Sequence, residues 1–116
     1  MKVMVNSVLE FEGWKRVFRD KMENQLTEIF NKTYAKVYSL TIIGVDKWNV
    51  EFMLIAPDTI GKEIQNKLAS NDVLKEALSE QTVIEIGNTI RRITYKIEAK
   101  TEEELNSKLM YINLMF

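Results

Sequence analysis

The segment TIIGVDKWNVEFMLIA, residues 41–56, decides how this chain is expected to fold. Apolar and polar residues alternate on both sides of a short polar break at Asp46 and Lys47, a pattern typical of a β-hairpin. Because Asn49 and Glu51 point away from their apolar neighbours, we expect one face of the hairpin to be covered and the other to meet water. The covered face is predicted to carry Tyr38, Leu40, Ile42, Trp48, Val50, Phe52 and Leu54.

The residues before this hairpin predict a strand and then a helix. Near-alternate β-branched residues and methionines in KVMVNSVLEF, residues 2–11, favour an initial strand. From Trp14 onward the spacing of the apolar residues changes to three and four, which indicates an amphipathic helix of about five turns. Its apolar face is expected to consist of Trp14, Val17, Phe18, Met22, Leu26, Ile29 and Phe30.

The residues after the hairpin predict two further helices. The only proline, Pro57, is expected to end the second strand, and Asp58 is a candidate N-cap of the next helix. The polar sequence SND, residues 70–72, separates this helix from a second, shorter one. The apolar residues expected to face inward are Ile60, Ile64, Leu68, Val73, Leu74, Ala77 and Leu78.

A second hairpin and a last helix complete the chain. Gly87 and Asn88 form a preferred central pair for a tight turn. Thr101 and Glu104 have the spacing of a capping box, so a C-terminal helix is expected to start there. In the returning strand, Ile93, Tyr95 and Ile97 are predicted on the covered face and Arg92, Thr94, Lys96 and Glu98 on the other. The last helix is expected to bury Leu105, Leu109, Ile112 and Phe116.

In order, these elements are strand, helix, hairpin, helix, hairpin and helix. Antiparallel strands with helices kept to one face make a two-layer α+β sandwich. The first four of these elements, with the hairpin counted as two strands, have the β-α-β-β-α order of ferredoxin-like folds, followed by a C-terminal hairpin and helix. With 116 residues and 46% hydrophobic content, the chain is expected to form one α+β domain over residues 1–116.

Two segments also resemble the layout of extracellular SEA domains. They are WKRVFRDKMENQLTEIF, residues 14–30, and VYSLTIIGVDKWNVEFMLIA, residues 37–56. In that family the second and third strands meet at a Gly-Ser peptide, where strain and the serine hydroxyl can drive self-cleavage. The corresponding break here reads VDKWNV, residues 45–50, and contains no serine. The resemblance therefore implies a spacer domain without self-proteolysis.

The composition argues against most enzyme classes. Histidine and cysteine are both absent, which removes the usual general acid/base at neutral pH and the common zinc ligands. The sequence has no glycine-rich phosphate loop and no carboxylates with calcium-loop spacing. We therefore expect no catalytic residues, no metal site and no cofactor. Sixteen basic and seventeen acidic residues give a net charge of −1, which argues against a general nucleic-acid binder.

The sequence shows neither a membrane span nor a secretory signal. No run approaches the roughly 18 apolar residues that a span requires. Asn6, Ser7, Glu10 and Glu12 interrupt the apolar core that a signal peptide would need. We therefore expect a soluble, cytoplasmic protein, or a secreted one if an upstream signal has been removed. The apolar sequence LMYINLMF, residues 109–116, is expected to complete the core, with self-association as the alternative.

The four arginines point to a binding site for an anion. Arg16 and Arg19 lie on the first helix, and Arg91 and Arg92 follow the second turn. Since adjacent strand residues point to opposite faces, one of Arg91 and Arg92 must face the helices or lie at the end of the sheet. Guanidinium groups there could hold a phosphate, a carboxylate or an acidic loop. The candidate binding residues are Lys15, Arg16, Arg19, Trp48, Arg91, Arg92, Thr94 and Lys96.

Ordinary salt bridges are the other interpretation of these arginines. Arg16 and Arg19 each have an acidic residue four positions further on. Glu85 lies across the second hairpin from Arg91 or Arg92, depending on the register of the two strands. Both interpretations stay open at this point.

The function expected from these features is that of a non-catalytic protein-interaction module. Such an adaptor, inhibitor or complex subunit would bind an acidic partner surface through the arginine-bearing face of its sheet. The partner would be another protein or a second copy of the chain. Two alternatives remain: a module that binds or sequesters a small anionic ligand such as a nucleotide, and an SEA-like extracellular spacer.

Overall fold

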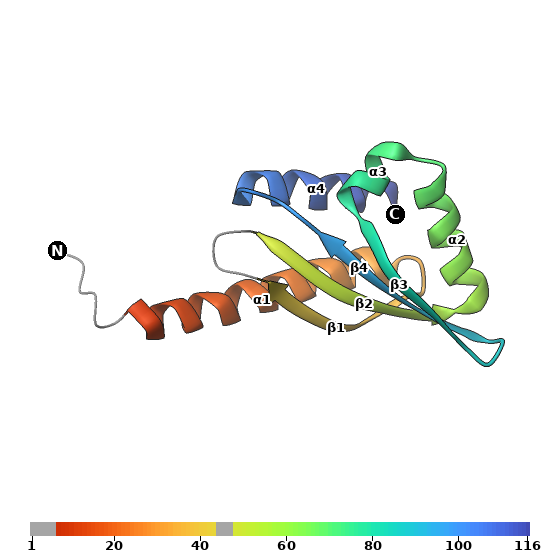
Figure 1. Cartoon of the computed structure of the whole chain (residues 1–116), viewed down its shortest axis with the longest axis horizontal. Helices are drawn as coiled ribbons and strands as arrows, with labels where there is room; N and C mark the ends of the chain where they lie inside the picture. Colours follow the sequence, from red (N-terminus) through yellow and green to blue (C-terminus); the bar gives the residue numbers. More distant parts are fainter. Residues whose placement is uncertain (1–6, 44–47) are drawn as a thin grey trace.

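A computed structural model describes residues 7–43 and 48–116, with side chains described for residues 15–42 and 48–116. The predicted turn at Asp46 and Lys47 and the first part of the predicted strand, residues 2–6, lie outside the described residues. The elements in chain order are α1 (Ser7–Asn31), β1 (Lys36–Ile43), β2 (Asn49–Pro57), α2 (Asp58–Ala69), α3 (Asp72–Ala77), β3 (Ser79–Ile86), β4 (Ile90–Ile97) and α4 (Glu102–Met115) (Figure 1).

The strands form one antiparallel sheet in the order β1-β2-β4-β3. Both predicted hairpins are present, β1 with β2 and β3 with β4, and the pairing of β2 with β4 joins them. Gly87, at φ 60°, takes the left-handed conformation in the tight turn between β3 and β4. In Figure 1 this turn extends beyond α2 at the lower right.

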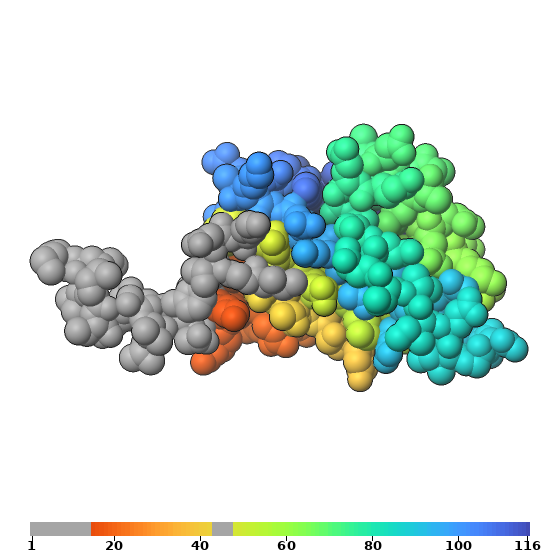
Figure 2. All heavy atoms as spheres, viewed as in Figure 1, coloured from red at the N-terminus to blue at the C-terminus, as the bar shows by residue number. Residues whose placement is uncertain are grey.

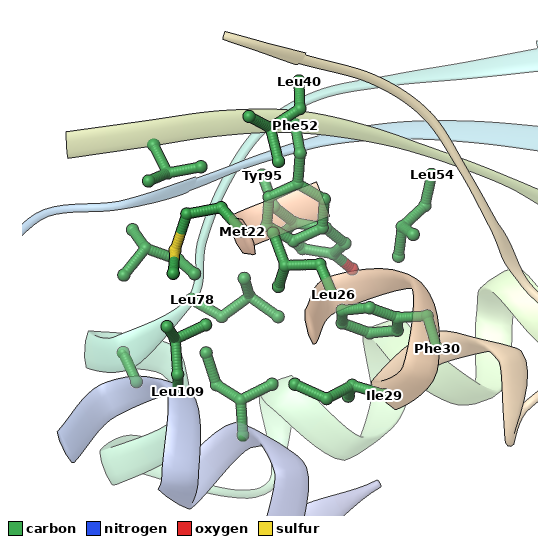
Figure 3. Packing of buried hydrophobic residues seen from close by; sticks show 14 of the residues in the cluster. Met22, Leu26, Ile29, Phe30, Leu40, Phe52, Leu54, Leu78, Tyr95 and Leu109 are labelled. Carbon is green, nitrogen blue, oxygen red and sulfur yellow. The ribbon is translucent and has the colours of Figure 1, made fainter. Parts of the chain in front are cut away.

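All four helices bury apolar side chains against the same face of the sheet. The core combines residues of α1, α2, α3 and α4 with the inward side chains of the strands. Figure 3 shows the strands on one side of this core and the helices on the other. At its centre, the Phe52 ring lies 5.7 Å from Phe30 and 5.9 Å from Tyr95. The predicted α+β class is confirmed, and the opposite face of the sheet, called the outer face below, carries none of the described helices.

The predicted initial strand is wrong where the structure describes it. Residues 7–11, expected to be extended, belong to α1, so the helix begins at Ser7 and not at Trp14. In the sequence, Val8, Phe11 and Trp14 continue the three-residue spacing of the later helix. The helical period therefore outweighs the local preference of β-branched residues for a strand.

The exact ferredoxin-like order is not confirmed. No strand precedes α1 within the described residues, and β4 takes the inner position next to β2. Because β4 is antiparallel to both of its neighbours, β2 and β3 run parallel to each other on either side of it. Through α2 and α3 they form a split β-α-β unit whose central strand comes later in the chain.

Three apolar residues predicted to face inward are exposed. The strand register shifts at Tyr38, which leaves this side chain 61% exposed, and Val37 packs against the core instead. Val17 is 70% exposed because the neighbouring residue Phe18 is the one that enters the core. Val73, near the start of α3, is also exposed.

The helix starts follow the predictions in part. Thr101 Oγ1 accepts a hydrogen bond from the backbone N–H of Glu104 at 3.1 Å, as predicted. The Glu104 carboxylate accepts one from the backbone N–H of Lys100 at 2.6 Å. The prediction that Asp58 caps α2 is wrong, because the N-cap is Pro57 and Asp58 is the first helical residue. The Asp58 carboxylate instead accepts a hydrogen bond from a side chain of the sheet.

The apolar C-terminal segment packs on the protein's own core, as predicted. Leu109 and Ile112 are buried, and the ring of Phe116 lies 5.1 Å from that of Phe30. Leu114 is the most exposed of the large apolar side chains in this segment. The segment therefore completes the helical layer.

Candidate functional site

Arg91 points from β4 into the helix-covered side of the sheet and is 8% exposed. Its Nε donates to Asp58 Oδ1 at 2.9 Å, Nη1 donates to Gln65 Oε1 at 2.8 Å, and Nη2 donates to Glu85 Oε1 at 2.7 Å. Asp58 and Gln65 belong to α2, and Glu85 belongs to β3. A single guanidinium group therefore ties α2 to the second hairpin.

The guanidinium group of Arg91 lies between two carboxylates, and one of them has a second cationic partner. Asp58 also forms a salt bridge with Lys62, one helical turn further on, at 3.0 Å. Hydrogen bonds from Lys62 and from Arg91 hold the pKa of Asp58 below its ordinary value. The hydrogen bond with Asp58 in turn raises the pKa of Arg91. Gln65 extends the network, because its Nε2 donates to Glu80 Oε1 at 2.9 Å.

Gly61 makes the close approach of Arg91 to α2 possible. A Cβ atom at this position would lie 2.8 Å from Arg91 Cδ and 2.9 Å from Arg91 Cβ. Glycine within a helix is otherwise unfavourable, so an isolated glycine in an amphipathic helix signals a close contact. Sequence reasoning missed Gly61, Asp58 and Gln65 as parts of one cluster, although the glycine gave this signal.

Arg92 points to the outer face, where its neighbours are different. It lies opposite Ile55 of β2 and Ile84 of β3, and Lys36 follows beyond Ile55. Cross-strand partners on the outer face form rows that run across the sheet. The rows on either side of Arg92 carry neutral residues: Ser39, Met53, Thr94 and Thr82 in one, and Pro57, Ile90 and Ile86 in the other. Arg92 Nε is buried and has no hydrogen-bond partner in the part of the chain that the structure describes.

Three of the predicted site residues come together on β4. Thr94 and Lys96 share the outer face with Arg92, and Lys96 lies opposite Glu51 and 3.8 Å from the carboxylate of Glu98. Side chains of β2, β3 and β4 form part of the surface visible in Figure 2. The name Arg92 patch is used below for Met53, Ile55, Ile84, Arg92, Thr94 and Lys96.

The predicted site residues of α1 lie in the helical layer. Arg19 Nε donates to a backbone carbonyl of β1 at 3.2 Å, Arg16 is exposed, and Lys15 is partly exposed. Trp48 is partly buried and makes an edge-to-face contact with Phe18, with ring centroids 5.1 Å apart. The single surface expected from these residues and the second arginine pair is therefore divided between the two layers.

The site is an open surface and not an enclosed pocket. Three hollows of about 450, 400 and 250 Å³ are present, and neither Arg91 nor Arg92 lines any of them. The hollow of about 400 Å³ borders the Arg91 network at Gln65 and Glu80. Among the described residues, no group of three or more acidic side chains could hold a metal ion. Within residues 7–43 and 48–116, no helix combines the length and the apolar character needed to cross a bilayer.

Comparison of the chain with protein-family models, with curated proteins and with solved structures gave no significant match. The resemblance to SEA domains therefore stays an expectation from the sequence. What the site can do is argued from its own geometry and charge.

Proposed function

We propose that this protein is a non-catalytic interaction module that binds an acidic segment of another protein on the outer face of its sheet. Arg92 is the anchor of this contact. The supporting observation is the difference in partners between two adjacent arginines. Arg91 has three side-chain acceptors, whereas Arg92 Nε is buried without a hydrogen-bond partner in the described part of the chain.

The chemistry of a guanidinium group suits a carboxylate partner. Its planar donors can bind both carboxylate oxygens at once, and a hydrogen bond between charged groups is stronger than one between neutral groups. Ile55 and Ile84 flank Arg92 and would exclude water from this contact. Arginine in an apolar surround is a frequent energetic centre of protein interfaces. The fitting partner residue is thus an Asp or Glu with apolar neighbours.

The charge of the outer face also favours an acidic partner. Lys36, Arg92 and Lys96 contribute three positive charges to this face, and Glu51 and Glu98 contribute two negative charges, both close to Lys96. The chain as a whole has a net charge of −1. The outer face therefore has a small net positive charge, centred on Lys36 and Arg92, on a nearly neutral protein, and such a charge speeds encounter with acidic surfaces at low ionic strength.

A charge reversal tests this proposal. We expect Arg92→Glu to lower partner capture in a quantitative pull-down by at least about tenfold, with little change in melting temperature. The matched control is Lys100→Glu, which reverses an exposed charge after β4 ends. Equal capture by the wild type and Arg92→Glu would overturn the proposal. Loss of thermal stability with retained capture would make Arg92 a structural residue.

The same pair of variants separates a protein partner from a small anion. Inorganic phosphate and nucleotides are tested as probes by thermal shift. If a nucleotide raises the melting temperature of the wild type but not of Arg92→Glu, the ligand of the patch is a small anion and the protein-partner proposal fails.

A further inference from the structure

β3 is an outer strand of the sheet with one free edge. It pairs with β4 on one side, and no described strand pairs with it on the other. Six of its eight residues are exposed, among them Ile84 at 43% and Ile86 at 44%. In Figure 1 the turn end of the β3–β4 hairpin reaches beyond the helices. Unpaired N–H and C=O groups along such an edge are a template for another strand.

The two outer strands of the sheet differ in how they are protected. β1 begins with Lys36, its register shifts at Tyr38, and α1 packs against it. Lysine and an irregular register are both common devices that prevent pairing at an edge. β3 has its register shift after Glu80, near its start, and contains neither lysine nor proline. Residues 82–86 of β3 are therefore a regular edge whose one charged residue, Glu85, is bound to Arg91.

The charges of β3 indicate which strand would fit beside it. Its two carboxylates already have partners in the same chain, because Glu80 binds Gln65 and Glu85 binds Arg91. On the outer face the regular stretch presents the uncharged, β-branched residues Thr82, Ile84 and Ile86. A fitting strand is neutral on this face and rich in β-branched residues, and β3 itself has this composition.

We propose that two copies of this chain associate by antiparallel pairing of their β3 strands, with Ile84 opposite Ile84 of the second copy. Residues 82–86 are centred on Ile84, so this register pairs the whole regular stretch. It places Thr82 opposite Ile86 and Val83 opposite Glu85, and no two like charges lie directly opposite each other. The product is one continuous eight-stranded sheet with the two Arg92 patches on the same face.

The size of this contact sets its expected strength. Stable protein interfaces bury about 1,200–2,000 Å² in total, and one pair of short strands buries less. We therefore expect a reversible dimer with a dissociation constant in the range of about 1 μM to 1 mM. This inference does not rest on the proposed function, because purified protein alone is sufficient for its test.

A cysteine variant tests the register directly, since the sequence has no cysteine of its own. Directly opposite residues in antiparallel strands have Cα atoms about 4.5–5.5 Å apart, within the span of a disulfide. Ile84→Cys should form a disulfide-linked dimer under mild oxidation at least about tenfold faster than Tyr38→Cys. Tyr38 is the control because it is exposed on the other outer strand. Equal rates for the two variants would overturn the proposed register.

Sedimentation equilibrium tests the dimer without relying on a cysteine. The wild-type mass should rise from 13.6 kDa toward twice that value as concentration increases to about 1 mM. Ile84→Lys should remain monomeric because it places a charge at the centre of the paired edge. The control Thr41→Lys, on the exposed side of β1, should dimerise like the wild type. A wild type that stays monomeric over this range would overturn the proposal and leave the Arg92 pull-down unaffected.

Discussion

Arg91 and Arg92 are adjacent in the chain and belong to the same strand, yet their surroundings have little in common. Arg91 lies between the sheet and α2, with acceptors from Asp58, Gln65 and Glu85. Arg92 lies on the outer face between Ile55 and Ile84. The backbone alternation of a strand separates the two guanidinium groups, and neighbouring elements then decide what each can do.

This difference teaches how to separate a structural cation from a binding one. A guanidinium group whose donors already meet carboxylate or amide oxygens of the same chain has little left to offer a ligand. One without an acceptor in the same chain keeps its accessible donors for a partner. Charge and exposure alone do not distinguish these cases, because the hydrogen-bond partners decide.

The largest expected effect is a loss of thermal stability when the side-chain contacts of Arg91 are removed. Arg91→Met should lower the melting temperature by roughly 5–15 °C, because α2 and the second hairpin lose their shared partner and the acceptors on Gln65 and Glu85 lose a donor. Thermal unfolding followed by circular dichroism measures the effect. Arg92→Met is the matched control and should change the melting temperature by less than about 3 °C. Similar losses in both variants would contradict the contrast drawn between the two arginines.

The next effect concerns the close approach at Gly61. Gly61→Ala should destabilise the protein by about 1–2 kcal/mol, because the clash with the Arg91 side chain exceeds the gain in helix propensity. Urea unfolding provides the free energy. In an Arg91→Ala background the cost should be smaller, since Cγ and Cδ of residue 91 are then absent. A stabilised single variant would show that α2 and β4 have room for the methyl group.

A smaller effect is expected in the pH dependence of stability. The pKa of Asp58 is lower in the folded protein than its ordinary value near 3.8. The unfolded chain therefore takes up this proton first as pH falls, so the contribution of Asp58 is present above about pH 4 and is lost below it. Asp58→Asn keeps an acceptor for Arg91 but does not titrate. Urea unfolding between pH 6 and pH 3 should give a shallower loss for this variant, and identical slopes would exclude the effect.

The sequence predicted much of β4 but not the partners of its arginines. Period-two alternation placed Ile93, Tyr95 and Ile97 inside, and it required one of the two arginines to face the helices or lie at the sheet's end. The acceptors on α2 lie 33 and 26 residues before Arg91. Their position depends on how α2 packs against the sheet, and the one local signal, Gly61, indicates a close contact without indicating its partner.

Two local errors have a similar origin. Residues 7–11 have β-branched and apolar residues that suit a strand, but the three-residue spacing continued into Trp14 and the helix extends through them. Tyr38 followed the alternation of β1, but a register shift moved it outward. In both places a short pattern fitted two structures. At Tyr38 the register of β1 against β2 decided between them.

The position of β4 has a consequence for how the protein is made. Once β1 and β2 have left the ribosome and β4 has not, β2 lacks its inner neighbour, and a two-stranded hairpin alone is marginally stable. Asp58 likewise has its partner on the sheet, Arg91, translated more than thirty codons later. The sheet can therefore close only after residues 90–97 leave the exit tunnel, and until then the nascent chain presents an open apolar strand to chaperones.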